Sequence, residues 1–404
     1  MSDTFIPVLR FAVMSDIHES AGYPHVRERF ASAMRDIYAY ADAHPTYTGL
    51  DALYLVGDVI NRGRASEYLL LKEDLEKNVR QDTLTVITLG GHDIHDSPVA
   101  KDDFLRIIGM PLDRHEVIHG YHFVSLSTER TTGPWSDSFG EEKRAFLRRS
   151  LEEATAADPT RPIFVFQHPG VFDTIGGGFY GNGELRDILA NYPAVVDFSG
   201  HSHIPANSPE ETYKGDFTAV STGGILELRD ASCVNEGIPF EEGLPYAHCL
   251  VVEVDAAHTV RIRHFDISAG EFFEDDVIVK ECYKKESKVY HTAYNPAGHA
   301  PAFPAHAALR IVSAGEKTSL VFPAAVGDGE RVKGYTVTLR DNAGHMLSEK
   351  NVISDYAACH MRDTVTIPLT DIPQTPFCAE VRPFGFHDDV GKPLTVRSSN
   401  AAEK

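Results

Sequence analysis

The sequence has few basic residues, and this deficit excludes several kinds of partner. Its 404 residues include 38 lysines and arginines against 59 aspartates and glutamates, which gives a formal net charge of −21. A surface with this balance repels the phosphate backbone of nucleic acids and anionic lipid headgroups. We therefore expect neither a nucleic-acid polymer nor a membrane as a partner. A small anionic substrate is compatible with the charge, because a bound metal ion reverses the local sign.

Long apolar runs and clustered cysteines are also missing. No uncharged apolar stretch approaches the roughly 20 residues that a membrane-spanning helix needs. The five cysteines are scattered and form no C-x-x-C pair, so we expect no disulfide framework. Residues 1–7 (MSDTFIP) lack the basic segment and the apolar segment of a secretory signal. We therefore expect a cytoplasmic protein, or a secreted one if a leader has been removed.

The length of the chain predicts more than one domain, at roughly 150 residues each. Residues 295–307 (NPAGHAPAFPAHA) are rich in proline and alanine and have no periodicity, which is typical of a linker. We therefore divide the chain into a domain at 1–290, a linker at 291–307 and a second domain at 308–404. The second domain carries short strand-like segments separated by turns, which predicts a small β-sandwich. These segments are 317–322, 335–339, 364–369 and 377–382.

The first two-thirds of the chain alternate between strand-like and helix-like segments, a pattern typical of a layered α/β domain. Residues 25–43 and 141–155 place apolar side chains on one helical face, and a shorter helix is expected after Gly183. From about residue 215 only strand-like segments continue. Short apolar runs typical of strands buried on both faces lie at 11–14, 53–56, 84–89, 163–166 and 195–198.

Residue types that bind metals follow each of these five apolar runs. Because ligands of open α/β sheets bind beyond the carboxyl ends of the strands, we expect these side chains to converge on one rim. Two carboxylates with several imidazoles suit a pair of transition metals better than magnesium or calcium, whose ligands are mainly oxygen. The motifs in chain order are Asp16-Ile-His18, Gly57-Asp58, Gly90-Gly91-His92-Asp93, His168 and Gly200-His201-Ser-His203.

This ordered set of motifs resembles that of the calcineurin-like metallophosphoesterase superfamily over about residues 8–270. The resemblance implies an α/β fold of four layers, a β-sandwich flanked by helices, and two ions of manganese, iron or zinc. It implies that Asp16, His18 and His203 bind the first metal, that His168 and His201 bind the second, and that Asp58 bridges both. The tail resembles a fibronectin type III domain through its strand pattern, and no feature of it identifies a partner.

The resemblance also implies residues that contact the substrate. His92 resembles the residue that contacts the phosphate and protonates the leaving alkoxide, and Asp93 could orient the His92 ring. Alternatively, Asp93 caps the segment that follows it. Arg62 lies where the superfamily's protein serine/threonine phosphatases place a phosphate-binding arginine, with a surface ion pair as the alternative. Asn61 stands where those enzymes carry an aspartate.

One position departs from the superfamily pattern. The asparagine that binds the second metal is replaced by Gly91, so one oxygen ligand is missing. Water could fill the vacancy, the second metal could bind weakly, or the glycine could be an introduced change. We predict a dinuclear-metal phosphoesterase that hydrolyses a small, nucleotide-like phosphodiester or phosphomonoester with a metal-bridging hydroxide. The alternative is a catalytically weakened protein that binds metal and recognises a ligand without efficient turnover.

Overall fold

The computed structural model describes residues 5–129, 139–176, 183–230, 244–285 and 300–398, apart from positions 316, 328, 371, 374 and 388. The described residues before position 286 form one compact unit, and those from position 300 onward form another. We call them the N-terminal unit and the C-terminal unit. No helix in the described part of the chain is long and apolar enough to cross a membrane.

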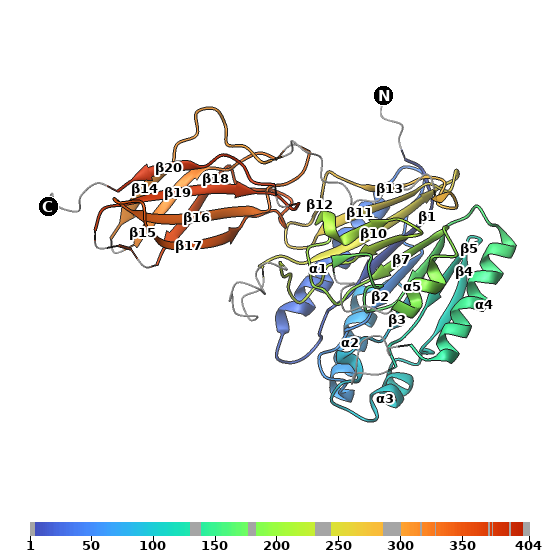
Figure 1. Ribbon diagram of the computed structural model, residues 1–404. Coiled ribbons are helices and arrows are strands. Elements are labelled where there is room, and N and C mark those ends of the chain that lie inside the picture. The colour runs from blue at the N-terminus through green and yellow to red at the C-terminus, as the bar shows by residue number, and fades with distance from the viewer. Residues whose placement is uncertain are drawn as a thin grey trace. The chain divides into compact units, whose positions relative to one another are not determined.

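Two β-sheets and their flanking helices build the N-terminal unit (Figure 1). The first sheet has the order β12-β11-β10-β1-β2-β3, with β13 paired to β11, and the second has the order β4-β5-β6-β7-β9-β8. Strands β1, β2 and β3 run parallel to one another, as do β5, β6, β7 and β9. The first sheet comprises β1 (Pro7–Met14), β2 (Ala52–Val56), β3 (Leu84–Thr88), β10 (His248–Asp255), β11 (Val260–Asp266), β12 (Glu271–Phe272) and β13 (Val277–Val279). The second comprises β4 (Arg114–Ile118), β5 (Tyr121–Ser125), β6 (Ile163–Phe166), β7 (Val195–Ser199), β8 (Thr212–Lys214) and β9 (Thr218–Ser221).

Alternating side chains of β1 explain how the layers stack. Phe11 and Val13 belong to the core between the two sheets, whereas Ala12 and Met14 belong to the core beneath the helices, because successive strand residues face opposite sides. The Phe11 ring lies 4.9 Å from that of Phe164 in the second sheet. The first sheet packs on α1 (Pro24–Asp42), α2 (Ala65–Asn78) and α3 (Ala100–Ile107), and the second on α4 (Glu141–Ala157) and α5 (Gly183–Leu189). The four-layer α/β architecture predicted from the sequence is confirmed.

The C-terminal unit consists of two antiparallel sheets around their own apolar core. One sheet has the order β14-β15-β18 and the other β17-β16-β19-β20. The strands are β14 (Arg310–Ala314), β15 (Lys317–Pro323), β16 (Gly334–Asp341), β17 (Met346–Ile353), β18 (Thr364–Leu369), β19 (Phe377–Phe384) and β20 (Leu394–Arg397). Both sheets contribute to the core, for example Phe322 from the first and Tyr335 from the second. The all-β character is therefore confirmed, while the fibronectin type III resemblance stays a prediction.

The C-terminal unit begins earlier than the predicted boundary at residue 308. Ala302 forms a β-bridge with Val326, and the Phe303 ring lies 5.8 Å from that of Phe322. Phe303 is partly buried and packs against the apolar core, although its proline- and alanine-rich surroundings resemble a linker. The rest of the predicted linker, up to residue 299, lies outside the described residues.

A buried ion pair fixes the register between β1 and β10. Arg10 and Glu253 face each other across the antiparallel ladder, and both side chains are fully buried. The Arg10 Nε donates to Glu253 Oε1 at 2.7 Å, and its Nη1 donates to the carbonyl of Tyr47 at 2.7 Å. Arg261 also pairs with Glu253. Because an unpaired buried charge is costly, this network stabilises the register that places the end of β1 at the candidate site.

We predict that Glu253→Gln lowers the free energy of unfolding by about 3–5 kcal/mol, because the buried Arg10 loses its counter-charge. Urea denaturation followed by circular dichroism measures this change. The matched control is Arg80→Gln, which removes an exposed ion pair with Asp42 and should leave the urea midpoint nearly unchanged. Equal midpoints for the two variants would contradict the structural importance of the Arg10–Glu253 pair.

Candidate metal centre

The six predicted metal ligands all lie just beyond the carboxyl ends of strands, and both sheets contribute. Asp16 and His18 follow β1, Asp58 follows β2, His168 follows β6, and His201 and His203 follow β7. Because parallel strands of one sheet end at the same edge, the loops of each sheet reach the same rim. Backbone hydrogen bonds join two of these loops: the Asp16 amide donates to the Gly57 carbonyl at 3.1 Å, and the His18 amide to the Asp58 carbonyl at 2.9 Å.

The six side chains form two adjoining groups. The first cluster is Asp16, His18 and His203, and the second cluster is Asp58, His168 and His201. Within each cluster, one ligand atom from each residue lies within 4.8 Å of the others. The His203 Nε2 is 3.1 Å from Asp16 Oδ1, and the His168 Nε2 is 2.9 Å from Asp58 Oδ2. The same His168 atom is 3.8 Å from Asp16 Oδ1, so the two clusters share one site.

The backbone at these positions adopts a conformation that ordinary residues avoid. The φ angles are 52° at Asp16, 51° at His18, 48° at Asp58, 73° at His201 and 56° at His203. Left-handed backbone costs a residue with a Cβ about 1–3 kcal/mol, and such residues concentrate at functional sites. This concentration of strain in five of six candidate ligands indicates that the fold is built to bring these side chains together.

Two glycines allow the loops to approach each other closely. A Cβ on Gly90 would lie 2.3 Å from Asp58 Oδ1, and a Cβ on Gly57, whose φ is 77°, would lie 2.5 Å from the His168 side chain. Neither position could carry a larger residue without displacing a side chain of the second cluster. Gly57 and Gly90 are therefore part of the site.

Hydrogen bonds from outside the clusters orient the ligands. The His168 Nδ1 lies 2.8 Å from the Val56 carbonyl, an arrangement in which Nδ1–H donates and Nε2 stays available to a metal. The Asp16 Oδ2 accepts from the His201 amide at 3.0 Å and from the Ser15 hydroxyl, which leaves Oδ1 for a metal. The Ser15 hydroxyl is also 2.5 Å from that of Thr222. Ser15 and Thr222 are positioning residues that the sequence reasoning missed, because serine and threonine at strand ends carry no distinctive signal.

Burial and neighbouring charges shift the pKa values of the ligand side chains in directions that favour cation binding. Burial lowers the pKa of His18 to about 3, and burial followed by the charge of His168 lowers the pKa of His201 to about 4. Both rings are therefore neutral at pH 7. Burial raises the pKa of Asp16, but His203 and His168 outweigh it and hold the pKa below its ordinary value. Burial lowers the pKa of His168, but Asp58 and Asp16 outweigh it and raise the pKa to about 10. This imidazolium between two carboxylates occupies the place of a cation.

The hydrogen bonding of His18 tests whether the two clusters suit a metal ion. Both ring nitrogens of His18 are buried and have no hydrogen-bond partner among the residues that the structure describes. A buried polar atom without a partner is costly and calls for an explanation. A metal ion would bind one of the His18 nitrogens and would replace the proton on His168. Neutral imidazoles with carboxylates are the ligands that manganese, iron and zinc accept.

The three residues predicted to act on the substrate, His92, Asp93 and Arg62, differ in their exposure and in their contacts. The His92 ring is exposed, its centroid lies 4.5 Å from that of His18, and its Nδ1 is 3.0 Å from the Asn61 carbonyl. The contact predicted between Asp93 and this ring is corrected by the structure. The buried Asp93 carboxylate instead accepts from the amides of Ile60 at 2.9 Å and Gly90 at 2.7 Å. Asp93 thus joins the loop after β2 to the loop after β3.

Arg62 forms a surface ion pair, the alternative to a phosphate-binding role. Its Nη1 lies 2.9 Å from Asp96 Oδ2, and its side chain is 54% exposed. Gly91, where the superfamily has its asparagine, is buried with φ −65° and ψ −47°. These are right-handed helical values that any residue adopts, so the backbone does not require glycine there.

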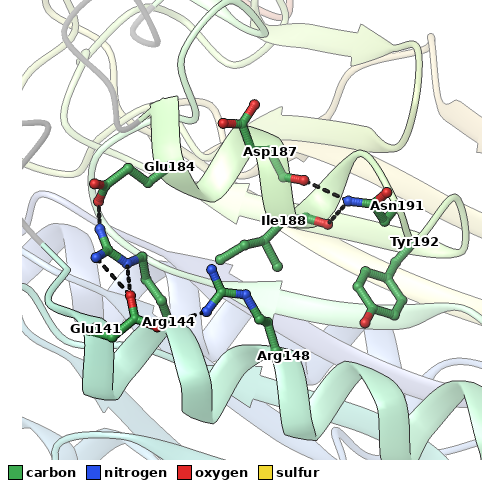
Figure 2. Close-up of a pocket in the computed structure, with 8 residues that line it drawn as sticks. All are labelled: Glu141, Arg144, Arg148, Glu184, Asp187, Ile188, Asn191 and Tyr192. Atoms are coloured by element: carbon green, nitrogen blue, oxygen red, sulfur yellow. Dashed lines mark hydrogen bonds and ion pairs between the residues drawn. The ribbon is translucent and has the colours of Figure 1, made fainter.

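A groove of about 410 Å³ between α4 and α5 contains none of the six ligands (Figure 2). Two arginines point into it from α4, but carboxylates already neutralise them. Arg144 pairs with Glu141 at 2.9 Å and with Glu184, and Arg148 pairs with Glu141 at 3.1 Å. We therefore assign no anion-binding role to this groove.

Residues 9–205 match the family described as Calcineurin-like phosphoesterase. The matched span lies within the N-terminal unit and includes all six candidate ligands. No curated protein matches the chain.

Three solved structures resemble this chain distantly. The purple acid phosphatase PPD1 from yellow lupin (Lupinus luteus) seeds matches with 13% identity and a TM-score of 0.49, over 68% of this chain and 55% of the lupin chain. This chain thus spans about half the length of that enzyme. The β-glucuronidase of Parabacteroides merdae matches with 11% identity and a TM-score of 0.26, over 97% of this chain and 61% of its own. The spore cortex lytic enzyme SleM of Clostridium perfringens matches with 11% identity and a TM-score of 0.18, over 97% and 98%. None of the three informs the function.

We predict that Asp58→Asn greatly reduces metal binding, because it removes the carboxylate charge that lies against both His168 and the first cluster. Isothermal titration of the metal-free protein with Mn²⁺ measures the loss. Asp42→Asn, which changes an exposed carboxylate, is the control and should bind metal as the parent does. Unchanged stoichiometry and affinity in a folded Asp58→Asn protein would contradict the role of Asp58.

Proposed function

We propose that this protein hydrolyses small phosphate esters with two metal ions held by the two clusters. The observation that supports the proposal most strongly is the adjacency of the clusters, three ligands each, inside a calcineurin-like phosphoesterase domain. Asp16, His18 and His203 would bind one ion, and His168 and His201 the other. Asp58 would serve both ions, since its charge influences the pKa of His18 in the first cluster as well as that of His168.

When bound, the two ions would activate a water molecule and offset the negative charge of the phosphoryl group. The protein itself fixes the positions of the metal ligands and of the loop that carries His92. The Asp58 Oδ1 accepts from the His92 amide at 2.8 Å, so the loop that carries His92 is fixed to the second cluster. Asp93 fixes the same loop to the loop after β2 by accepting a hydrogen bond from the Ile60 amide, and it braces its own loop by accepting from the Gly90 amide.

His92 is the group best placed to exchange a proton with the substrate. Its ring is exposed at the edge of the first cluster, and the Asn61 carbonyl accepts from Nδ1–H, which leaves Nε2 available. When protonated, Nε2 would donate a hydrogen bond to the phosphate and pass its proton to the leaving alkoxide. Arg62 receives no role in catalysis, because Asp96 holds its guanidinium.

The substrate class follows from charge and size. The net charge of −21 disfavours long polyanions, whereas a small ester carries few charges and would meet the positive ions first. A nucleotide-like phosphodiester or phosphomonoester therefore suits the site best. The second candidate function is a metal-binding recognition protein with weak turnover, and the glycine at position 91 is the observation that favours it.

We expect the chelated protein to hydrolyse bis-p-nitrophenyl phosphate or p-nitrophenyl phosphate only after Mn²⁺, Fe²⁺ or Zn²⁺ is added. His92→Asn should lower kcat by about 10²–10⁴, because the leaving group loses its proton donor. His345→Asn is the control, since His345 is exposed, pairs with Asp341 in the C-terminal unit and should leave kcat unchanged. Metal binding without turnover on either ester would overturn the hydrolase and favour the recognition protein.

We expect Gly91→Asn to supply the missing amide oxygen to the second cluster and to tighten its metal. The buried, right-handed backbone at this position tolerates asparagine. The Mn²⁺ concentration for half-maximal activity should fall, and calorimetry should report a tighter second binding event. If the parent already binds two ions equally tightly and Gly91→Asn changes neither measurement, water or another residue has replaced the asparagine.

A further inference from the structure

A third cluster of metal-binding side chains lies on other elements of the N-terminal unit. His115 belongs to β4, His122 to β5 and Glu153 to α4. One ligand atom from each of these residues lies within 4.8 Å of the others. Strand β4 is the edge of the second sheet, and α4 lies beside the β4–β5 hairpin (Figure 1). None of the three residues belongs to a motif of the proposed phosphoesterase site.

The register of the hairpin brings the two rings together. His115 is opposite Val124 and His122 is opposite Val117, so the two histidines lie on one face in a diagonal pair. The His115 Nε2 is 2.8 Å from the His122 Nδ1, and the His115 Nδ1 is 3.8 Å from Glu153 Oε2. Two imidazoles at hydrogen-bond distance hold one proton between two nitrogen lone pairs, and a metal ion can replace this proton.

The geometry requires only a small adjustment. Two zinc–nitrogen bonds of about 2.0–2.1 Å at a tetrahedral angle place the nitrogens about 3.3 Å apart, so the rings would separate by roughly 0.5 Å. The Glu153 side chain, 68% exposed, has the freedom to turn toward the ion. The carboxylate supplies one negative charge to a dication.

We propose that His115, His122 and Glu153 form a separate zinc-type site, with water as the fourth ligand, that clasps α4 to the β4–β5 hairpin. Two imidazoles and one carboxylate are a ligand set that zinc accepts with an open fourth position. The ion links an edge strand to the helix that covers its sheet, so its expected effect is on stability rather than on hydrolysis.

The test compares full-length variants that have been stripped with chelator and reloaded with Zn²⁺. Elemental analysis after gel filtration should find one fewer zinc ion per chain in His122→Gln and in Glu153→Gln than in the parent. The rise in Tm that Zn²⁺ produces should shrink in both variants. Glu153→Gln changes an exposed side chain, so it keeps the test valid if His122→Gln folds poorly. Metal-dependent ester hydrolysis should be unchanged in both.

The control is His119→Asn in the turn of the same hairpin. His119 contacts Asp51 rather than the cluster, and asparagine tolerates its φ of 50°. This variant should bind as much zinc as the parent. An equal zinc count in the parent, His122→Gln and Glu153→Gln would overturn the third site. Asp58→Asn reports on the phosphoesterase site alone, so the failure of one proposal is distinguishable from the failure of the other.

Discussion

Two carboxylates and four imidazoles lie close together at one site. The electrostatic interactions among them are the constraint that the rest of the N-terminal unit has to satisfy. Buried carboxylates need positive partners, and buried imidazoles resist protonation. The structure satisfies both demands only in part: Asp58 and Asp16 outweigh burial and raise the pKa of His168, while both ring nitrogens of His18 are buried with no hydrogen-bond partner among the described residues. Metal ions in the two clusters would satisfy the remaining ligand atoms. The arrangement of the six side chains is therefore the one expected of a cation-binding site.

Buried strands and a tightly packed core stabilise the strained loops that carry the six ligands. Each ligand loop leaves a strand that is buried on both faces, and the core between the sheets is dense in aromatic rings, such as Phe11 against Phe164. The left-handed backbone at five ligands is strain that such a core can carry. The Arg10–Glu253 pair fixes the register of β1, and Asp93 joins the loops after β2 and β3. These features of the N-terminal unit together hold the six ligand side chains in position.

The sequence predicted the elements whose apolar patterns are strong, and it missed those whose signals are short. The strand at 163–166 and the helix at 141–155 were found because their apolar patterns are strong; the structure has them at Ile163–Phe166 and Glu141–Ala157. Helices α2 and α3 were missed. The carboxylate of Glu67 caps α2, and acidic residues begin α3, but these signals are short. The six ligands came from ordered motifs, whereas the contacts of Asp93 and Arg62 depend on loop geometry that spacing does not encode.

The most direct test is anomalous diffraction from crystals of the full chain soaked with Mn²⁺. The account predicts two manganese peaks about 3.5–4 Å apart, one at Asp16, His18 and His203 and the other at His168 and His201, with Asp58 between them. The peak near Gly91 should have the lower occupancy. A single peak, or manganese bound only elsewhere on the acidic surface, would contradict the central claim that the two clusters form one dinuclear site.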